Sequence, residues 1–356
     1  MSTILIEDAA GIVQAADIAF STHARLRSLL PWLPAHRRED FAGRIGWMAE
    51  EGRVYGLVQE PDGPLEAFLA WFPLDEYRNL GRAALSPDWS WGIRSPAGNP
   101  VAGAVASPDA RREARRISRL LSPLVRRLLA DLREEGLSIH AIGIPAREPA
   151  LLEEFSLLSW GRIVLDVARP AHELLASLPV SQEGDTDSDA PSLVVRRARP
   201  ADAETLARLD QSLADHIAAP PVLMPDTRPS TPTEWREWLA SPENLSVIAE
   251  CDGRAVGFMK AAPPQMDVSW FVHSPHTLAI CGLWVDPSCR GRHLGERLLR
   301  FLVTSALARQ KDGTEPGAAN DEELLVSVDC ETHNPEARAF WLQHFEPVSW
   351  SFERRF

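Results

Sequence analysis

The stretch that decides the fold is His276-Thr-Leu-Ala-Ile-Cys-Gly-Leu-Trp-Val-Asp-Pro-Ser-Cys-Arg-Gly-Arg-His-Leu-Gly-Glu-Arg-Leu-Leu299. Its first part, from Thr277 to Val285, is an apolar run that stops at Asp286-Pro287. After a short glycine-containing turn, leucines recur at helical spacing on one face: Leu294, Leu298, Leu299 and Leu302. This pattern predicts a strand, a loop and a helix in that order.

The predicted loop, Arg290 to Gly295, leads directly into the predicted helix. Backbone N–H groups at a helix start have no intrahelical acceptor, and together with the positive end of the helix dipole they suit a phosphate or pyrophosphate. The small residues Gly291 and Gly295 allow an anion to approach the main chain closely. Taken alone, the stretch is also compatible with an ordinary strand-to-helix turn that has exposed arginines.

A second stretch favours the anion-binding loop over an ordinary strand-to-helix turn. A strand-like run from Leu324 to Cys330 is followed by Asn334-Pro-Glu-Ala-Arg-Ala-Phe-Trp-Leu-Gln-His-Phe345 and by a final run, Val348 to Phe356. The loop resembles the Arg/Gln-x-x-Gly-x-Gly/Ala signature of the GNAT acyltransferase superfamily. The second stretch is similar to that family's Asn-x-x-Ala-x-x-Phe-Tyr-x-x-x-Gly-Phe element, with four positions in register: Asn334, Ala337, Phe340 and Phe345. Two motifs in the right order and spacing make the resemblance specific.

The resemblance implies an α/β (α+β) fold with a mixed, mostly antiparallel sheet flanked by helices, and acetyl-CoA as co-substrate. It also implies a set of cofactor-binding residues in the strand end, the loop, the helix start and the second motif: Leu283, Trp284, Val285, Arg290, Gly291, Arg292, His293, Leu294, Gly295, Glu296 and Asn334. In this family the neutral amine attacks the thioester directly, so positioning and carbonyl polarisation provide most of the rate.

Two residues depart from the family pattern. His293 stands where the family usually has glycine; its N–H can still bind an anion if φ is negative, and its imidazole can either face the phosphate or point outward. Trp341 stands where the family usually has the tyrosine that protonates the departing thiolate, and an indole is not a usable acid. Trp341 can equally be a core residue that packs under the cofactor.

The general base is not placed by the resemblance. The positions where family members often have Glu or His are occupied by Ala279 and Cys281, and neither is a convincing base. We therefore consider weaker candidates in the same half, first His276 and Glu331 and then Asp329 and Glu250. Each of these four can equally be a surface group.

Composition limits the class of protein. With 356 residues, of which 45% are hydrophobic, the chain can form two domains that each bury a core. A formal charge of −13 argues against a nucleic-acid partner. Neither a long apolar stretch nor an N-terminal leader is apparent, so we expect a soluble cytoplasmic protein without a membrane partner. The four cysteines show no metal-ligand spacing, so we expect them to be reduced and predict no metal site.

Residues 181–192 are polar, acidic and free of large apolar side chains, which is the composition of a linker. Directly after them, Leu193 to Asp202 predicts a strand followed by a helix start at Pro200. The predicted domains are therefore residues 1–180 and 193–356.

The two predicted domains share an internal repeat. Asp62-Gly63 and Asp252-Gly253 are 190 residues apart, and each lies between two strand-like runs, as in a hairpin. Ser159-Trp160 and Ser349-Trp350 are also 190 apart. In between, Val105 to Arg111 can be aligned with Val285 to Arg290 if extra loop residues are assigned to 94–100 and 312–322. This spacing indicates a tandem pair of GNAT-type domains.

The two copies differ in chemistry. Arg112 and Arg116 stand where the second copy has Gly291 and Gly295, which leaves no close backbone approach for a pyrophosphate. These arginines could bind phosphate through their side chains. We favour an amphipathic helix whose arginines face water and whose apolar face holds Leu120, Leu121, Leu124, Leu128 and Leu129. The first domain is then a degenerate copy, and one acetyl-CoA is expected per chain.

Two classes of function follow. The first is an N-acetyltransferase that acts on a primary amine of a small molecule. The alternative is a CoA-binding regulatory or scaffold protein whose catalysis has lapsed, as suggested by Ala279, His293 and Trp341 together. The acceptor pocket is expected to involve the proline-rich segment from Asp215 to Trp238. The sequence does not identify the acceptor amine. It also does not determine the oligomeric state, and a homodimer is possible.

Overall fold

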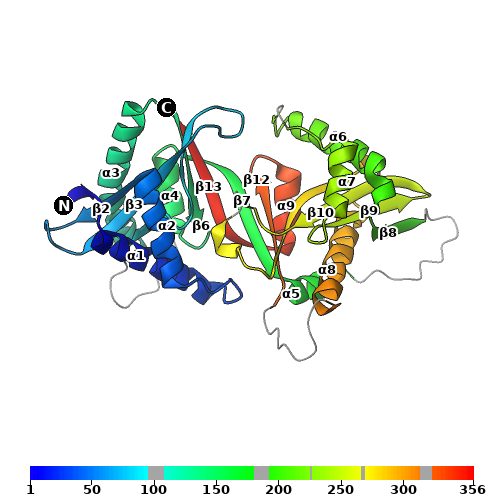
Figure 1. The fold of residues 1–356 in the computed structure, drawn as a ribbon, viewed down its shortest axis with the longest axis horizontal. Coiled ribbons are helices and arrows are strands. Elements are labelled where there is room, and N and C mark those ends of the chain that lie inside the picture. The colour runs from blue at the N-terminus through cyan, green and yellow to red at the C-terminus, as the bar shows by residue number, and fades with distance from the viewer. Residues whose placement is uncertain (95–107, 180–191, 225–226, 266–268, 313–322) are drawn as a thin grey trace. The chain divides into compact units, whose positions relative to one another are not determined.

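The computed structural model describes residues 1–94, 108–179, 192–224, 227–265, 269–312 and 323–356 (Figure 1). The chain forms two compact units. The first comprises Met1–Asp166, Ser269–Phe271 and Pro347–Phe356, and the second comprises Val167–Val268 and Val272–Glu346. Within the described ranges, no helix has the length and apolar character needed to cross a membrane.

One order of elements occurs twice along the chain. The first copy consists of β1 (Ser2–Leu5), α1 (Ala9–Leu29), α2 (Arg38–Glu51), β2 (Arg53–Val58), β3 (Leu65–Leu74), β4 (Ala83–Ser86), β5 (Trp91–Ile93), α3 (Pro108–Glu134), β6 (Ile139–Pro145), α4 (Pro149–Leu157) and β7 (Gly161–Pro170), and α5 (Ala171–Ser177) follows it. The second copy consists of β8 (Leu193–Arg197), α6 (Ala203–Ala218), α7 (Pro232–Ala240), β9 (Leu245–Cys251), β10 (Arg254–Ala262), β11 (Thr277–Val285), α8 (Leu294–Asp312), β12 (Leu325–Glu331), α9 (Pro335–His344) and β13 (Glu346–Arg355). Short 3₁₀ turns are η1 (Pro200–Asp202), η2 (Trp270–Val272) and η3 (Pro287–Cys289). The repeated order confirms the predicted tandem architecture.

Each unit contains a mixed sheet. In the first unit the strand order is β1-β2-β3-β4-β6-β13, with β4 and β6 parallel. Strand β7 follows β13 in this order and belongs to the first unit only up to Asp166. In the second unit the order is β8-β9-β10-β11-β12, with β11 and β12 parallel and the other neighbours antiparallel. Mostly antiparallel sheets flanked by helices are the predicted fold class, which is thereby confirmed.

The two units are not continuous halves of the sequence. Strand β13 forms an antiparallel ladder with β6, from Ser349 opposite Pro145 to Arg355 opposite Ile139, so the C-terminal residues belong to the first unit. The sequence pattern predicts the strand, but it does not identify the partner that satisfies its backbone groups. The predicted linker, residues 181–192, lies outside the described residues except for Ser192, so the linker stays a prediction.

In the second unit, α6 and α7 cover one face of the sheet and α8 covers the other (Figure 1). The α6–α7 face buries Phe258 and Trp284 from the strands against Leu206 and Trp235 from the helices. On the opposite face, α8 buries the leucines that defined its apolar stripe in the sequence: Leu294, Leu298, Leu299 and Leu302. The strand, loop and helix predicted from residues 276–299 are therefore confirmed.

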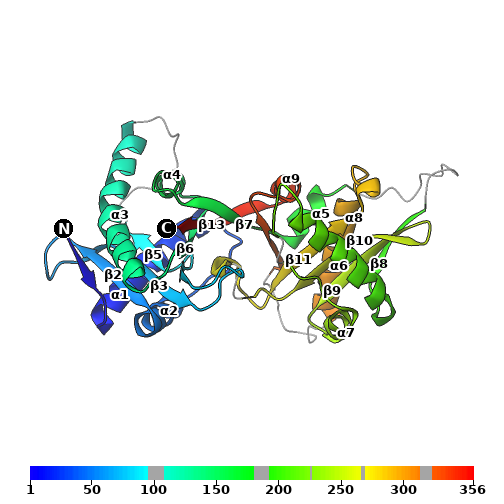
Figure 2. The same cartoon turned by 90° about the horizontal axis from the view of Figure 1, so that it is seen from above.

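In the first unit, α1 and α2 cover one face of the sheet and α3 and α4 cover the other (Figure 2). Helix α3 buries Leu120, Leu121, Leu124 and Leu128. Arg112, Arg115 and Arg119 are exposed, whereas Arg116 is partly buried, pairs with Glu113 and donates to the main chain of Arg94. The predicted amphipathic helix is confirmed, but Arg116 does not face water as predicted.

The two predicted hairpins are present. Strands β2 and β3 pair on either side of Asp62-Gly63, and β9 and β10 pair on either side of Asp252-Gly253. Asp252 and Gly253 have φ values of 50° and 77°, as a tight hairpin turn of type I′ requires. Val105 and most of the two segments assigned as extra loop residues, 94–100 and 312–322, lie outside the described residues.

Candidate functional site

The loop between β11 and α8 has two residues in the left-handed region. Gly291 has φ of +72° and His293 has φ of +57°. Glycine adopts this conformation without steric cost, whereas a histidine does not. The condition of negative φ that we set for His293 is therefore not met, and the position keeps the backbone of a glycine although its residue has changed. His293 lies at the surface, and its Nδ1 is 3.1 Å from Oε1 of Glu296.

Gly295 allows two helices to approach closely. A Cβ atom at this position would lie 2.9 Å from the ring of Phe340 on α9, inside van der Waals contact. At Gly291, in contrast, a Cβ would meet no atom within 4 Å, so only its φ value favours glycine. The second glycine of the motif is thus a packing requirement and the first a conformational one.

The start of α8 offers main-chain donors. Its first intrahelical bond runs from Arg297 N–H to His293 C=O at 3.0 Å, so the N–H groups of Leu294, Gly295 and Glu296 precede the helical ladder. Gly291, Arg292 and His293 are exposed in front of them. Donors and helix dipole together form a site suited to an anion.

Arg290 connects this loop to α9. Its Nε donates to the carbonyl of Val285 at 3.2 Å, and its Nη1 lies 2.5 Å from the Glu336 carboxylate in the first turn of α9. Its guanidinium also stacks 5.1 Å from the ring centroid of Trp284. Because its charge is already paired, we expect Arg290 to hold the shape of the loop more than to bind an anion directly.

Strands β11 and β12 separate after a short stretch of pairing. Their parallel ladder covers Thr277–Ile280 opposite Leu325–Val328. At this point β11 also has a bulge, since Ala261 pairs with Ile280 and Lys260 pairs with Gly282, which leaves Cys281 as the extra residue. Among the described residues, the ladder with β12 does not extend beyond the bulge, and an extended ligand needs such an unladdered strand edge.

Charged and aromatic side chains gather beside this bulge on the α6–α7 side of the sheet. The Lys260 ammonium lies 3.9 Å from the Asp210 carboxylate and over the rings of Trp235 and Trp238, at 4.9 and 5.3 Å from their centroids. A Cβ at Gly282 would lie 2.9 Å from Cε of Lys260, so this glycine makes room for the lysine stem. Sequence reasoning missed this cluster, although Lys260 is one of only two lysines in the chain.

Cys281 and Asp329 lie near each other where the strands separate. In the parallel register, Asp329 follows directly after Val328 as Cys281 follows Ile280, and both residues are exposed. The protein around the Cys281 sulfur replaces much of its hydration and raises the pKa of its thiol to about 11; the Asp329 carboxylate acts in the same direction and the Lys260 charge opposes it. Cys281 is therefore a thiol, not a thiolate, at neutral pH.

The second motif serves mainly structural roles in the described geometry. Asn334 caps α9, since its side-chain oxygen accepts the N–H of Ala337 at 3.1 Å. Trp341 is buried, with ring centroids 4.8 Å from Phe340 and 5.6 Å from Phe345. Of the two interpretations of Trp341, the geometry favours the core residue.

The weaker base candidates lie in different places. His276 precedes β11, about 30 Å of extended strand away from Val285, so the structure does not bring it to the loop. Glu331 ends β12, two residues beyond Asp329, and lies 3.9 Å from His333. Glu250 pairs with Arg196 at 2.5 Å on β9. Asp329 is the one of these four that lies beside the bulge.

The corresponding place in the first unit is filled by the chain itself. There β4 and β6 pair up to Ser86 opposite Ile142. A Cβ at the next residue, Gly143, would lie 2.8 Å from the main-chain nitrogen of Asp88, and the indole of Trp91 donates to the Gly143 carbonyl at 2.6 Å. Helix α3 begins at Pro108, so Arg112 and Arg116 lie within a helix, whereas Gly291 lies in the loop before α8.

The unusual backbone at His293 leads to a first prediction. We expect His293→Gly to raise the free energy of unfolding by about 1 kcal/mol, because it removes the cost of a side chain at positive φ. Gly291→Ala should lower it by about the same amount, since it introduces that cost without any contact. Chemical denaturation of the full chain measures both changes, and two shifts of the same sign would contradict the prediction.

Part of the chain matches a known protein family, and solved structures are similar to the chain. Residues 213–345, from α6 to α9, match the model of the Acetyltransferase (GNAT) family. The chain is similar to the solved structure of a tandem GNAT protein from the clavulanic acid biosynthesis pathway, at 13% identity and a TM-score of 0.44, covering 99% of this chain and 98% of that chain. It is also similar to a GCN5-related N-acetyltransferase from Sphaerobacter thermophilus, at 15% identity and a TM-score of 0.49, covering 99% and 95%. No curated protein matches the chain in sequence.

Proposed function

Because residues 213–345 match the model of the Acetyltransferase (GNAT) family, we propose that the chain transfers an acetyl group from acetyl-CoA to a primary amine of a small molecule by direct attack. One observation carries the proposal. The N–H groups that precede the hydrogen-bond ladder of α8 and the separation of β11 from β12 lie at the same end of the second unit. A ligand with an anionic group and an extended arm can therefore bind the N–H groups of α8 and the edge of β11 at the same time.

The residues present fit such a ligand. Main-chain donors from Gly291 to Glu296 would hold the pyrophosphate, with Arg292 exposed beside them. The edge of β11 from Leu283 to Val285 would pair with the amide groups of the pantetheine arm, as an added strand does. The contacts of Asn334 and Trp341 described above would hold α9 in place beside the proposed binding site.

A carboxylate near the bulge would act as the proton acceptor. In the proposed reaction the amine forms a C–N bond with the acetyl carbon, the C–S bond breaks, and CoA leaves as its thiol. We assign the amine proton to the Asp329 carboxylate, directly or through one water, because Asp329 lies beside the bulge. With Trp341 in the core and no tyrosine in residues 193–356, the departing sulfur takes its proton from solvent.

Direct attack is also favoured over a covalent acetyl-enzyme. With a pKa of about 11, roughly one Cys281 in ten thousand is a thiolate at pH 7, which makes Cys281 a weak nucleophile. The Lys260 ammonium pairs with Asp210 and lies over two indole rings, which stabilise its charged form. Lys260 is therefore also a weak nucleophile. The external amine is therefore the expected acetyl acceptor.

The test is release of free thiol from acetyl-CoA in the presence of a panel of amines that includes polyamines, aminoglycosides and amino acid amides. We expect at least one amine to raise thiol release well above the rate without acceptor. Binding of CoA without amine-dependent release across the whole panel would favour the alternative, a CoA-binding regulatory or scaffold protein.

The filled strand gap in the first unit leads to a prediction of stoichiometry. Asp88 and Trp91 contact β6 where a pantetheine arm would need to lie, so we expect one acetyl-CoA per chain. Calorimetric titration of the full chain measures this number. A second, equivalent site would show that the first unit is also functional.

A further inference from the structure

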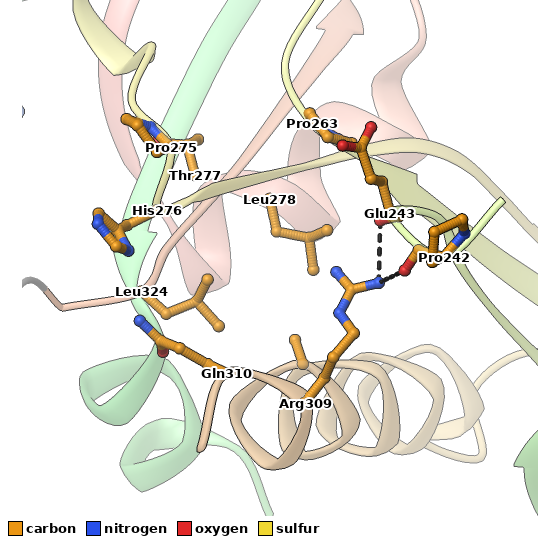
Figure 3. A pocket seen from close by; sticks show the side chains of 11 residues that line it. Pro242, Glu243, Pro263, Pro275, His276, Thr277, Leu278, Arg309, Gln310 and Leu324 are labelled. Atoms are coloured by element: carbon orange, nitrogen blue, oxygen red, sulfur yellow. Dashed lines mark hydrogen bonds between the residues drawn. The ribbon is translucent and has the colours of Figure 1, made fainter. Parts of the chain in front are cut away.

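A cavity of about 380 Å³ lies in the second unit, away from the anion loop (Figure 3). Most of its wall is proline and aliphatic: Pro242, Pro263, Pro275, Leu278, Ala306 and Leu324. Arg309, on the last turns of α8, lies about 22 Å along the helix from Leu294. The cavity is therefore separate from the proposed acetyl-transfer site, and its volume lies within the range of small-molecule sites.

One cation projects into this cavity. Nη1 of Arg309 donates to the carbonyls of Pro242 at 2.8 Å and Glu243 at 3.0 Å, and Asn244 O lies at 3.4 Å. These contacts fix the guanidinium against the turn before β9, and Figure 3 shows it reaching from α8 toward Leu278. Within the described part of the chain, all hydrogen bonds of Arg309 go to neutral carbonyls.

The charge of Arg309 is incompletely compensated. Burial lowers the pKa of Arg309, the nearby charge of Arg197 lowers it further, and Glu243 opposes these effects. A guanidinium that has lost hydration and gained only carbonyl dipoles is stabilised by an added anion. Its planar set of N–H groups, of which Nη1 is already used, favours a planar, bidentate partner.

We propose that this cavity binds a small monocarboxylate with a short apolar chain. The carboxylate pairs with the remaining N–H groups of Arg309, and the chain lies against the proline and leucine walls. A phosphate dianion fits less well, because the cavity presents a single fixed cation and the carboxylate of Glu243 is on its rim. This site does not depend on the proposed acetyltransferase function.

The experiment uses the full chain and hexanoate as the probe, with hexanamide as its uncharged analogue and inorganic phosphate as an anion without an apolar chain. Calorimetric titration should show binding of hexanoate, and at least about tenfold weaker binding of hexanamide and phosphate. Arg309→Met and Ala306→Phe should each weaken hexanoate binding at least about tenfold, the first by removing the cation and the second by filling the cavity.

Arg300→Met is the matched control. Arg300 also lies on α8 and donates to backbone carbonyls, those of Leu175, Leu178 and Pro179, but it does not line the cavity. It should leave hexanoate binding within about twofold of the unmodified chain. No binding of hexanoate, equal binding of hexanamide or phosphate, or equal losses in the Arg300 and Arg309 variants would overturn the proposal. If Arg309→Met does not fold, Ala306→Phe decides, and CoA binding should be unchanged in it.

Discussion

Gly295→Glu is expected to lower the affinity of the chain for CoA by at least about tenfold. The new carboxylate would stand in the first turn of α8 and would compete with an external anion for the main-chain donors and the positive end of the helix dipole. Like charges at this short distance repel strongly, and the longer side chain fills the space next to the donors. Titration of CoA into the folded variant measures the loss.

The control for this change must separate charge from packing. Any side chain at position 295 meets the Phe340 ring, since even a Cβ would lie 2.9 Å from it. Gly295→Ala makes that contact without a charge, so it should lower stability while it retains most of the CoA affinity. If the glutamate variant is folded and binds CoA as the unmodified chain does, α8 is not the pyrophosphate site.

The sequence predicted the elements of this site better than it predicted their partners. Apolar spacing located β11 and α8, and the Asp-Gly turns located both hairpins, because these signals are local. The pairing of β13 with β6 depends on residues about 200 positions apart, and no local pattern encodes it. For the same reason, the boundary drawn at 181–192 does not describe the two compact units.

At the level of single residues, the motif alignment identified positions but not conformations. It marked His293 as a departure from glycine, yet only the backbone shows that φ is still positive there. It also placed Trp341 at the usual position of a general acid, while the contacts with Phe340 and Phe345 place its ring in the core. The Lys260 cluster is brought together by three elements, α6, α7 and β10, so no single stretch predicts it.

Asp329→Asn is expected to lower kcat for amine acetylation by about a hundredfold or more and to leave CoA affinity unchanged. An amide keeps the size of the side chain but cannot accept the amine proton. The loss should shrink at high pH, because hydroxide from the solvent can then take the proton that the amine loses as the C–N bond forms. A residue with a merely structural role would not give that pH dependence, so the pH–rate profile of kcat is the measurement that decides.

Two variants test whether this role belongs to Asp329 alone. Glu331→Gln changes the carboxylate two residues farther along β12, where the strands have already separated, and we expect a change of only a few-fold. His276→Ala changes a residue about 30 Å of strand away from Val285, and we expect no change in kcat. If Glu331→Gln or His276→Ala gives the larger loss, that residue is the base. The proton would then have to travel from the acceptor amine along β12 to Glu331 or along β11 to His276. It would not go directly to a carboxylate beside the Cys281 bulge.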